Sequence, residues 1–343
     1  MKTIITESVA EAAEVIRSGG TVAFPTETVY GLGANVFNES AVRRIFTAKG
    51  RPADNPLIVH ISQPEQIDEL SSEVTASARK FTDAFFPGPL TVVLKKSERV
   101  PLIATAGLDT VGVRMPRSAI AREFLAACAT PVAAPSANIS GRPSPTTWQA
   151  VFEDLDGRID CILKGEPTEI GLESTVVDCT GNVPVLLRAG AVSLEDLRRV
   201  IPETRADIEI ASQEFRSPGL RHQHYKPAAE VRLVGPEDPI HDENTAAYIG
   251  LHERRESFSF VKVCPSVEEY AHDLFEFFRE CDRRKIQNIY CEKVAEVGIG
   301  RALMDRIERA ANRQEVAAII FQRTKKWPGM GHPRRWKSAP SNR

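Results

Sequence analysis

Four short clusters of polar and glycine residues, each at the end of an apolar run, constrain this chain more than any other feature. The clusters are P-T-E-T-V-Y-G-L-G at 25–33, K-G-R-P at 49–52, P-S-A-N at 135–138 and E-S-T-V at 173–176. The apolar runs have the length and composition of buried strands. Side chains that leave neighbouring strand ends together can converge on one cleft. The sequence therefore predicts a sheet whose polar connections build one pocket, suited to a phosphate and an amino acid.

Length and composition place the chain among soluble globular proteins. With 343 residues, of which 42% are hydrophobic and 26% charged, two domains are favoured over one. No apolar run approaches the roughly 18 residues that a membrane-spanning helix requires. The N-terminus is acidic already at Glu7, too early for a signal peptide. We therefore expect a cytoplasmic protein with no membrane contact. The net charge of −2 argues against a protein that binds nucleic acid over most of its surface.

The six cysteines are predicted to be buried free thiols. No two are spaced as C-x-x-C, and most lie in apolar stretches, which disfavours a zinc site or disulfides. The chain also lacks a Walker A sequence, a kinase signature, an H-E-x-x-H helix and a G-x-S-x-G elbow. Any nucleotide must therefore be held by side chains from scattered segments, and we expect no metal bound by protein ligands.

Helical and strand patterns are mixed along residues 1–205, with several strands in a row. This order favours an α/β or α+β domain built on a mixed sheet. Helices are expected at 8–18, 39–48, 73–86, 118–128, 147–155 and 193–200, and Asn38 is expected to cap the second. Strands are expected at 21–24, 57–61, 90–94, 110–114, 131–134, 161–163, 175–178 and 183–187.

The rest of the chain divides into three further segments. Residues 206–229 lack apolar periodicity and are rich in His, Arg and Tyr, so we interpret them as a linker that contacts the active site. Residues 230–320 alternate strands and helices, as a small parallel α/β domain does. Residues 321–343 hold seven cations and no acid. This tail is expected to be flexible, either as a solvated terminus or as an RNA-steering arm.

One glycine turn in the third of these segments has two interpretations. The sequence Gly298-Ile299-Gly300 precedes the last expected helix, and a helix N-terminus can hold a phosphate. The spacing falls short of the full G-x-G-x-x-G pattern, so tight packing of the backbone is favoured.

Lys49 and Arg51 are two cations that can face one anion across an intervening glycine. The planar guanidinium and the point charge of the ammonium together suit a triphosphate. The alternative is a helix C-terminus whose cations contact the helix dipole. Asn55 and His60 add polar groups at the edges of the next strand and favour the binding site. For His60 alone, a hydrogen-bonded core histidine is the alternative.

A second set of polar side chains follows other strands. Ser136 and Asn138 can donate to phosphate or ribose oxygens or form a simple turn, but the polar run continues through Ser144, too far for a turn alone. Arg114 and Arg188 each end a strand, where a charge facing a core needs a partner. That partner is either a ligand carboxylate or an internal salt bridge.

Together these segments resemble the YrdC/Sua5 family of threonylcarbamoyl-AMP synthases. The resemblance rests on the segments at 25–33, 49–57, 87–91, 111–116, 134–141 and 173–178. The S-P-G-L-R-H-Q-H-Y-K-P sequence at 217–227 and the α/β pattern after it resemble the two-domain Sua5 type. The resemblance covers about residues 5–315. It implies an α/β fold, with a YrdC-like twisted mixed sheet and helices at 1–205 and a smaller Rossmann-like α/β domain at 230–320.

The resemblance also implies an activity. Members of this family join L-threonine, bicarbonate and ATP into L-threonylcarbamoyladenylate and release pyrophosphate, which makes them nucleotidyltransferases. Mg²⁺ accompanies the ATP. The product feeds the t6A modification of tRNA adenosine 37 through a separate transferase complex. A direct tRNA contact is left open.

Roles for individual residues follow from the matching positions. The resemblance implies ATP contacts for Arg51, Asn55, Thr110, Ser136, Asn138, Ser144, Arg188 and Tyr225. It implies L-threonine contacts for Thr28, His60, Arg114 and Ser174. Lys49 and Arg51 are the expected catalytic residues, acting on the phosphates. No general base is required, because the expected mechanism is positioning and neutralisation of developing charge.

Two other functions compete with this one. A plain RNA-binding module would use a basic surface and the tail at 321–343. A relative of the carbamoyltransferase maturation proteins, which also contain YrdC-like domains, ranks last, because the acylphosphatase and zinc-finger segments expected there are absent from the sequence.

Overall fold

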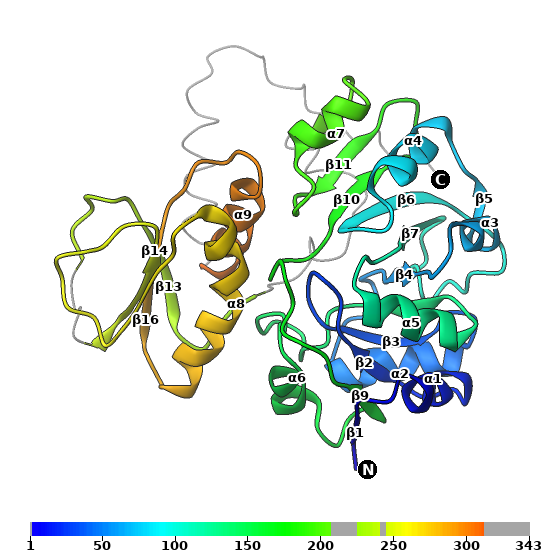
Figure 1. Cartoon of the computed structure of the whole chain (residues 1–343), viewed down its shortest axis with the longest axis horizontal. Coiled ribbons are helices and arrows are strands. Elements are labelled where there is room, and N and C mark those ends of the chain that lie inside the picture. The colour runs from blue at the N-terminus through cyan, green and yellow to red at the C-terminus, as the bar shows by residue number, and fades with distance from the viewer. Residues whose placement is uncertain (1, 207–224, 241–244, 312–343) are drawn as a thin grey trace, which may run out of the picture. The chain divides into compact units, whose positions relative to one another are not determined.

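The computed structural model describes residues 2–206, 225–240 and 245–311 (Figure 1). All of them fall in one compact unit, Met1–Ala311. Most of the predicted linker, at 207–224, lies outside the described residues, as does the predicted tail at 321–343. Within the described ranges, no helix is both long enough and apolar enough to cross a membrane.

The first sheet has twelve strands of mixed direction, which confirms the predicted mixed sheet. Their order is β1-β9-β2-β3-β8-β4-β7-β6-β10-β11-β12, with β5 beside β6. The central strand β4 runs parallel to β7 and antiparallel to β8. The strands are β1 (Ile4–Thr6), β2 (Val22–Phe24), β3 (Gly31–Asn35), β4 (Ile58–His60), β5 (Ser71–Glu73), β6 (Leu90–Lys96), β7 (Thr110–Arg114), β8 (Val132–Ala134), β9 (Cys161–Leu163), β10 (Thr175–Asp178), β11 (Val185–Arg188) and β12 (Arg205–Ala206).

The helices of this part begin where polar side chains cap them. In α1, α2, α4, α6 and α7 the residue before the helix accepts a hydrogen bond from a backbone N–H of the first turn. Asn38 does so for α2, as predicted. The helices are α1 (Val9–Arg17), α2 (Glu39–Lys49), α3 (Ile67–Leu70), α4 (Ala76–Phe85), α5 (Ala119–Cys128), α6 (Trp148–Leu155) and α7 (Leu194–Val200), with a 3₁₀ turn at Pro64–Gln66.

A second sheet of four parallel strands follows, as the alternating pattern predicted. Its order is β13-β16-β14-β15, and Figure 1 shows α8 and α9 on the same side of it. Both helices pack on this face through a shared apolar cluster that includes Ala247, Phe275 and Leu303. The elements are β13 (Glu230–Val234), β14 (Ala247–Gly250), β15 (Phe260–Val263), α8 (Val267–Arg283), β16 (Asn288–Glu292) and α9 (Gly300–Ala310).

The glycine turn before α9 serves packing, the interpretation that the sequence favoured. A Cβ on Gly300 would lie 2.2 Å from the carbonyl oxygen of Ala295, closer than real atoms approach. All six cysteines are free and buried, which confirms the prediction of buried thiols.

Several elements differ from the predicted pattern: β1, α3, β5 and β12 were not expected, and two further differences have a clear physical reason. The segment at 31–35 is strand β3, antiparallel to β2, although its glycines have low strand propensity. A Cβ on Gly33 would lie 2.6 Å from Val132 Cγ1, so the neighbouring strand requires glycine there. The expected helix at 73–86 begins only at Ala76, because Thr75 caps it and the residues before it pair with β6.

The two faces of the first sheet have different roles. Leu57, Val59 and Ile61, around β4, belong to the main apolar core. The alternating residues Pro56, Ile58 and His60 point to the opposite face, where they line a pocket. The site therefore lies over the face of the sheet as well as at strand ends.

Candidate functional site

One pocket collects most of the residues predicted to bind a ligand. The described residues that line it are Thr26, Thr28, Val29, Gly31, Arg51, Pro56, Ile58, His60, Arg114, Ala134, Pro135, Ser136, Asn138, Ser144, Glu173, Ser174, Arg188 and Tyr225. Arg51, Ser136 and Arg188, which come from distant parts of the chain, therefore face one cavity. The convergence predicted from the motifs is present.

Lys49 is a predicted site residue that does not line the pocket. Its side chain is almost fully buried, and its ammonium donates to the backbone carbonyls of Ser136, at 2.6 Å, and of Asn138. Burial is the main cause that holds the pKa of Lys49 well below its usual range. In this geometry the Lys49 ammonium stabilises the loop at 135–138 through these two hydrogen bonds. The contact of Lys49 with phosphate stays a prediction.

Arg51 lies just past the end of α2, where Gly50 adopts a positive φ of 59°. Its guanidinium lines the pocket and donates to the carbonyls of Asn55 (3.3 Å) and Pro56 (3.2 Å). Burial lowers the pKa of Arg51 to about 10, so it stays cationic at neutral pH. The sequence left open a helix end or an anion site, and the structure contains both a helix end and a cation facing a pocket.

Asn55 and Thr110 also lie outside the pocket lining. Asn55 is buried, and its Nδ2 has no hydrogen-bond partner among the described residues. Thr110 lines a smaller adjacent cavity on the same face of the sheet. Pro56 and Ile58 line both cavities, so Thr110 lies next to the pocket. Their predicted contacts with ATP are not tested by this geometry.

The loop at 135–138 presents an ordered polar surface to the pocket. Ser136 Oγ donates to Asn138 Oδ1 at 2.6 Å, and Asn138 Nδ2 donates to the carbonyls of Ile139 and Arg142. These bonds fix the amide orientation. The loop is therefore held in one shape by its own side chains and by Lys49.

Arg114 forms an internal salt bridge, one of the two alternatives that the sequence left open. Its Nη2 lies 2.7 Å from Glu27 Oε1, and its Nη1 donates to Thr28 Oγ1 at 2.8 Å. Burial alone would raise the pKa of Glu27, but the charge and hydrogen bond of Arg114 lower it overall. Glu27 also accepts from the backbone N–H of Arg117. This pair fixes Thr28 and the guanidinium at one end of the pocket.

His60 is a buried, neutral imidazole in the pocket wall. Burial first, and the positive charge of Arg114 second, lower the pKa of His60 to about 3. Its ring meets Phe24 edge-on, with centroids 5.7 Å apart. Its Nδ1 is buried and has no hydrogen-bond partner among the described residues. A buried polar atom normally has a hydrogen-bond partner, so this nitrogen is available to a ligand.

At the other end of the pocket, Arg188 holds Ser174. Arg188 donates to the carbonyl of Ser174 (3.0 Å) and to its hydroxyl (3.1 Å), and that hydroxyl also shares a hydrogen bond with Thr91. Burial lowers the pKa of Arg188. Arg188 therefore contacts a neighbouring backbone and still faces the cavity.

Tyr225 directly follows the segment at 207–224, which lies outside the described residues, and it lines the same pocket. It is buried, its φ is +66°, and its ring stacks on Phe275 of α8 at 5.3 Å. Positive φ in a residue other than glycine is strained and clusters at functional sites. The predicted contact between the end of the linker segment and the pocket is therefore present for this residue.

Glu173, which lines the pocket, and Glu27, which pairs with the pocket residue Arg114, were missed by sequence reasoning. Glu27 holds Arg114, while Glu173 lines the pocket and accepts from Ser144 Oγ at 2.5 Å. Each acid lies inside one of the four motifs, next to residues that were singled out. The signal that could have identified them was an acid inside a polar strand-end motif, in a chain whose strand-end arginines, Arg114 and Arg188, need a negatively charged partner.

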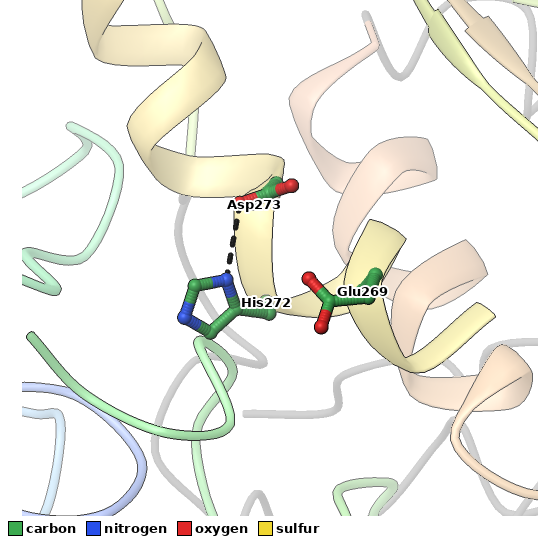
Figure 2. Close-up of side chains that lie close together, drawn as sticks. All are labelled: Glu269, His272 and Asp273. Carbon is green, nitrogen blue, oxygen red and sulfur yellow. Dashed lines mark hydrogen bonds and ion pairs between the residues drawn. The ribbon is translucent and has the colours of Figure 1, made fainter. Parts of the chain in front are cut away.

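One group of side chains has spacing suited to a metal within the described residues. Figure 2 shows Glu269, His272 and Asp273 on α8, with a 3.0 Å hydrogen bond between His272 and Asp273. Asp273 is also paired with Lys262 at 2.8 Å, which neutralises part of the charge that a metal would need. None of the three lines the pocket described above.

Two models of known protein families together match residues that form both sheets. A Sua5/YciO/YrdC family model described as "Telomere recombination" matches residues 14–190. A model described as "Threonylcarbamoyl-AMP synthase, C-terminal domain" matches residues 192–312.

Among individual relatives, a threonylcarbamoyl-AMP synthase of Pyrococcus abyssi is 46% identical over 318 residues, which are 88% of this chain and 93% of that protein. A threonylcarbamoyl-AMP synthase of Bacillus subtilis is 40% identical over 320 residues, 88% and 92% of the two chains. The crystal structure of P. abyssi Sua5 complexed with L-threonine superposes with a TM-score of 0.83 at 44% identity, covering 90% of this chain and 97% of that one.

Proposed function

This chain belongs to the Sua5/YrdC family, and from that premise we propose that its pocket condenses L-threonine, bicarbonate and ATP into L-threonylcarbamoyladenylate and pyrophosphate. One observation carries the proposal. Cationic, hydroxyl and amide side chains from residues 28 to 225, far apart in the sequence, line a single pocket. The reaction class is nucleotidyl transfer.

The two ends of the pocket suit two substrates. Thr28, Arg114 and the neutral His60 lie around the Glu27 pair, where an amino acid would find hydroxyl, cation and imidazole groups. That L-threonine binds is known for the P. abyssi relative. Ser174, the fourth predicted L-threonine contact, is hydrogen-bonded to Arg188. The predicted nucleotide contacts are Arg51, Asn55, Thr110, Ser136, Asn138, Ser144, Arg188 and Tyr225.

The chemistry needs no protein base. The threonine amine forms a bond to the bicarbonate carbon, a carbon–oxygen bond of bicarbonate breaks with loss of water, and the proton of the threonine ammonium goes to solvent. The carboxylate oxygen of the resulting threonylcarbamate attacks the α-phosphorus of ATP. The bond from that phosphorus to the bridging oxygen breaks, and its electrons leave with pyrophosphate. Arg188 is buried and Arg51 is half-buried, so both are proposed to stabilise the developing charge more strongly than exposed cations would. Lys49 shapes the loop at 135–138 and is proposed to approach the phosphates when they are bound.

Mg²⁺ is proposed to arrive with ATP. Glu173 is the carboxylate that lines the described part of the pocket, and it is already paired with Arg306 and with Ser144. A magnesium ion would therefore be held mainly by phosphate oxygens and water, with hydroxyl and amide groups such as Ser136 and Asn138 nearby. When bound, it would neutralise charge on the leaving pyrophosphate.

The proposal extends to organisation and context. We assign catalysis to residues 1–205, a linker contact to 206–229 and a separate α/β domain to 230–320. We further propose that the product passes to a tRNA-modifying transferase in the cytoplasm, with direct tRNA contact through 321–343 as an open possibility.

The test is a pyrophosphate-release assay with ATP, L-threonine and bicarbonate, in which each substrate is left out in turn. We expect release that depends on all three and a product with the mass of threonylcarbamoyl-AMP. Pyrophosphate release that is indifferent to threonine or bicarbonate would contradict the proposal. RNA binding without turnover would favour the RNA-binding module instead.

A further inference from the structure

Arg306, in the middle of α9, is a fully buried cation that reaches toward the pocket without lining it. Its guanidinium Nε lies 2.9 Å from Glu173 Oε2, and its Nη2 donates to the carbonyl of Ala189 at 2.9 Å. Its Nη1 pairs with Asp305 at 2.6 Å. A buried arginine with this many directed bonds has a fixed orientation, and it fixes the groups that it contacts.

The first group that Arg306 fixes is the Glu173 carboxylate. The other oxygen of Glu173 accepts from Ser144, which lines the pocket. Burial alone would raise the pKa of Glu173, but the charge of Arg306, followed by that of Arg188, lowers it overall. Glu173 is therefore held ionised, and an ionised carboxylate can only accept, so the Ser144 hydroxyl is turned toward it.

The second group is the backbone next to Arg188. Ala189 follows Arg188 directly, and its carbonyl accepts from Arg306. Arg188 itself bonds Ser174 and faces the pocket. The end of β11, from which the Arg188 side chain emerges, is thus attached to α9.

The third group is the ring of Tyr225. The guanidinium carbon of Arg306 lies 5.4 Å from the ring centroid, within the range of a cation–π contact. Phe275 stacks on the same ring at 5.3 Å. The strained Tyr225 is therefore held in the pocket wall by side chains of α8 and α9.

We propose that Arg306 is a positioning residue that preorganises the nucleotide end of the pocket. Ser144, Arg188 and Tyr225, the three pocket residues next to its contacts, are all predicted ATP contacts. The amino-acid end is held by a different pair, Glu27 and Arg114. This inference rests on the proposed function. It gives the C-terminal α/β region a role in catalysis that requires no ligand of its own.

The experiment compares full-length variants by calorimetric titration with MgATP and, separately, with L-threonine. Arg306→Lys keeps the charge but cannot reproduce the three directed bonds. Arg306→Gln combined with Glu173→Gln removes both charges of this ion pair, while Asp305 keeps Arg309 as its partner. Arg309→Gln is the matched control, because Arg309 lies one turn along α9 and pairs with the same Asp305. Melting temperatures are recorded for each variant.

We expect Arg306→Lys to stay folded and to bind ATP about ten-fold more weakly, equivalent to about 1.4 kcal/mol, with L-threonine affinity changed less than two-fold. In turnover, the loss should appear as a raised KM for ATP. The Arg309 control should leave both affinities unchanged. Normal ATP affinity in a folded Arg306→Lys or double variant would overturn the proposal. So would equal losses for both ligands, or failure of both variants to fold, since either outcome means a purely structural role.

Failure of the proposed function gives a different result. In that case the unsubstituted chain would show no pyrophosphate release dependent on threonine. The positioning role is read from ATP binding without turnover, so the two conclusions are reached separately.

Discussion

Because the His60 imidazole is buried and neutral in the folded chain, the free energy of unfolding should decrease in mild acid. The size of the decrease follows from the folded and unfolded pKa values of this histidine. The pKa of His60 falls from an ordinary 6.5 to about 3 in the folded chain. A group whose folded pKa is lower than its unfolded pKa contributes stability above the unfolded value and loses it as the pH falls. The window is therefore pH 6.5 down to about 3.

At pH 5 the unfolded chain binds a proton at this histidine and the folded chain does not. The difference is about 1.5 pH units at about 1.36 kcal/mol each, so His60 removes about 2 kcal/mol of unfolding free energy at pH 5 and almost none at pH 7.5. His60→Gln removes the titrating group and keeps a polar side chain of similar length.

The assay is urea unfolding of both proteins at pH 7.5 and pH 5, followed by circular dichroism. Other titrating groups are common to both chains and cancel in the comparison. The unsubstituted protein should lose about 2 kcal/mol more than His60→Gln on acidification. An NMR titration should find His60 neutral down to about pH 4. Equal losses within about 0.5 kcal/mol, or a measured pKa near the ordinary value, would refute the burial argument.

Three further substitutions test other parts of the structure. Arg51→Ala should abolish pyrophosphate release while the melting temperature stays within a few degrees, and near-normal turnover would refute its phosphate role. Glu27→Gln should cost about 3–5 kcal/mol of unfolding free energy, because it leaves Arg114 buried and unpaired; adding Arg114→Met should recover part of that, and no recovery would disprove the pairing account. Gly33→Ala should destabilise by about 1–3 kcal/mol through overpacking, whereas Gly181→Ala, whose nearest neighbouring atom would be 3.9 Å away, should be close to neutral by urea unfolding.

Local patterns determined most of the secondary structure. The preference of a helix cap such as Asn38 acts within a few residues, so this helix start was read from the sequence. The Thr75 cap was missed, and the helix that follows it was predicted to start at residue 73. The parallel second sheet followed from strand–helix alternation in the same way. Strand β3 was missed because its glycines are required by contacts with Val132 on a strand about a hundred residues away.

The sequence by itself indicated most of the side chains that face the pocket, because cations, hydroxyls and amides at the ends of apolar strand patterns have few structural uses. Only the tertiary structure decided how they are held. It paired Arg114 with Glu27, turned the Lys49 ammonium toward loop carbonyls and placed Arg306 of α9 behind Glu173. Each of these contacts joins residues more than 80 positions apart. A buried charge must find its partner through the folded chain, and no local pattern encodes which one it finds.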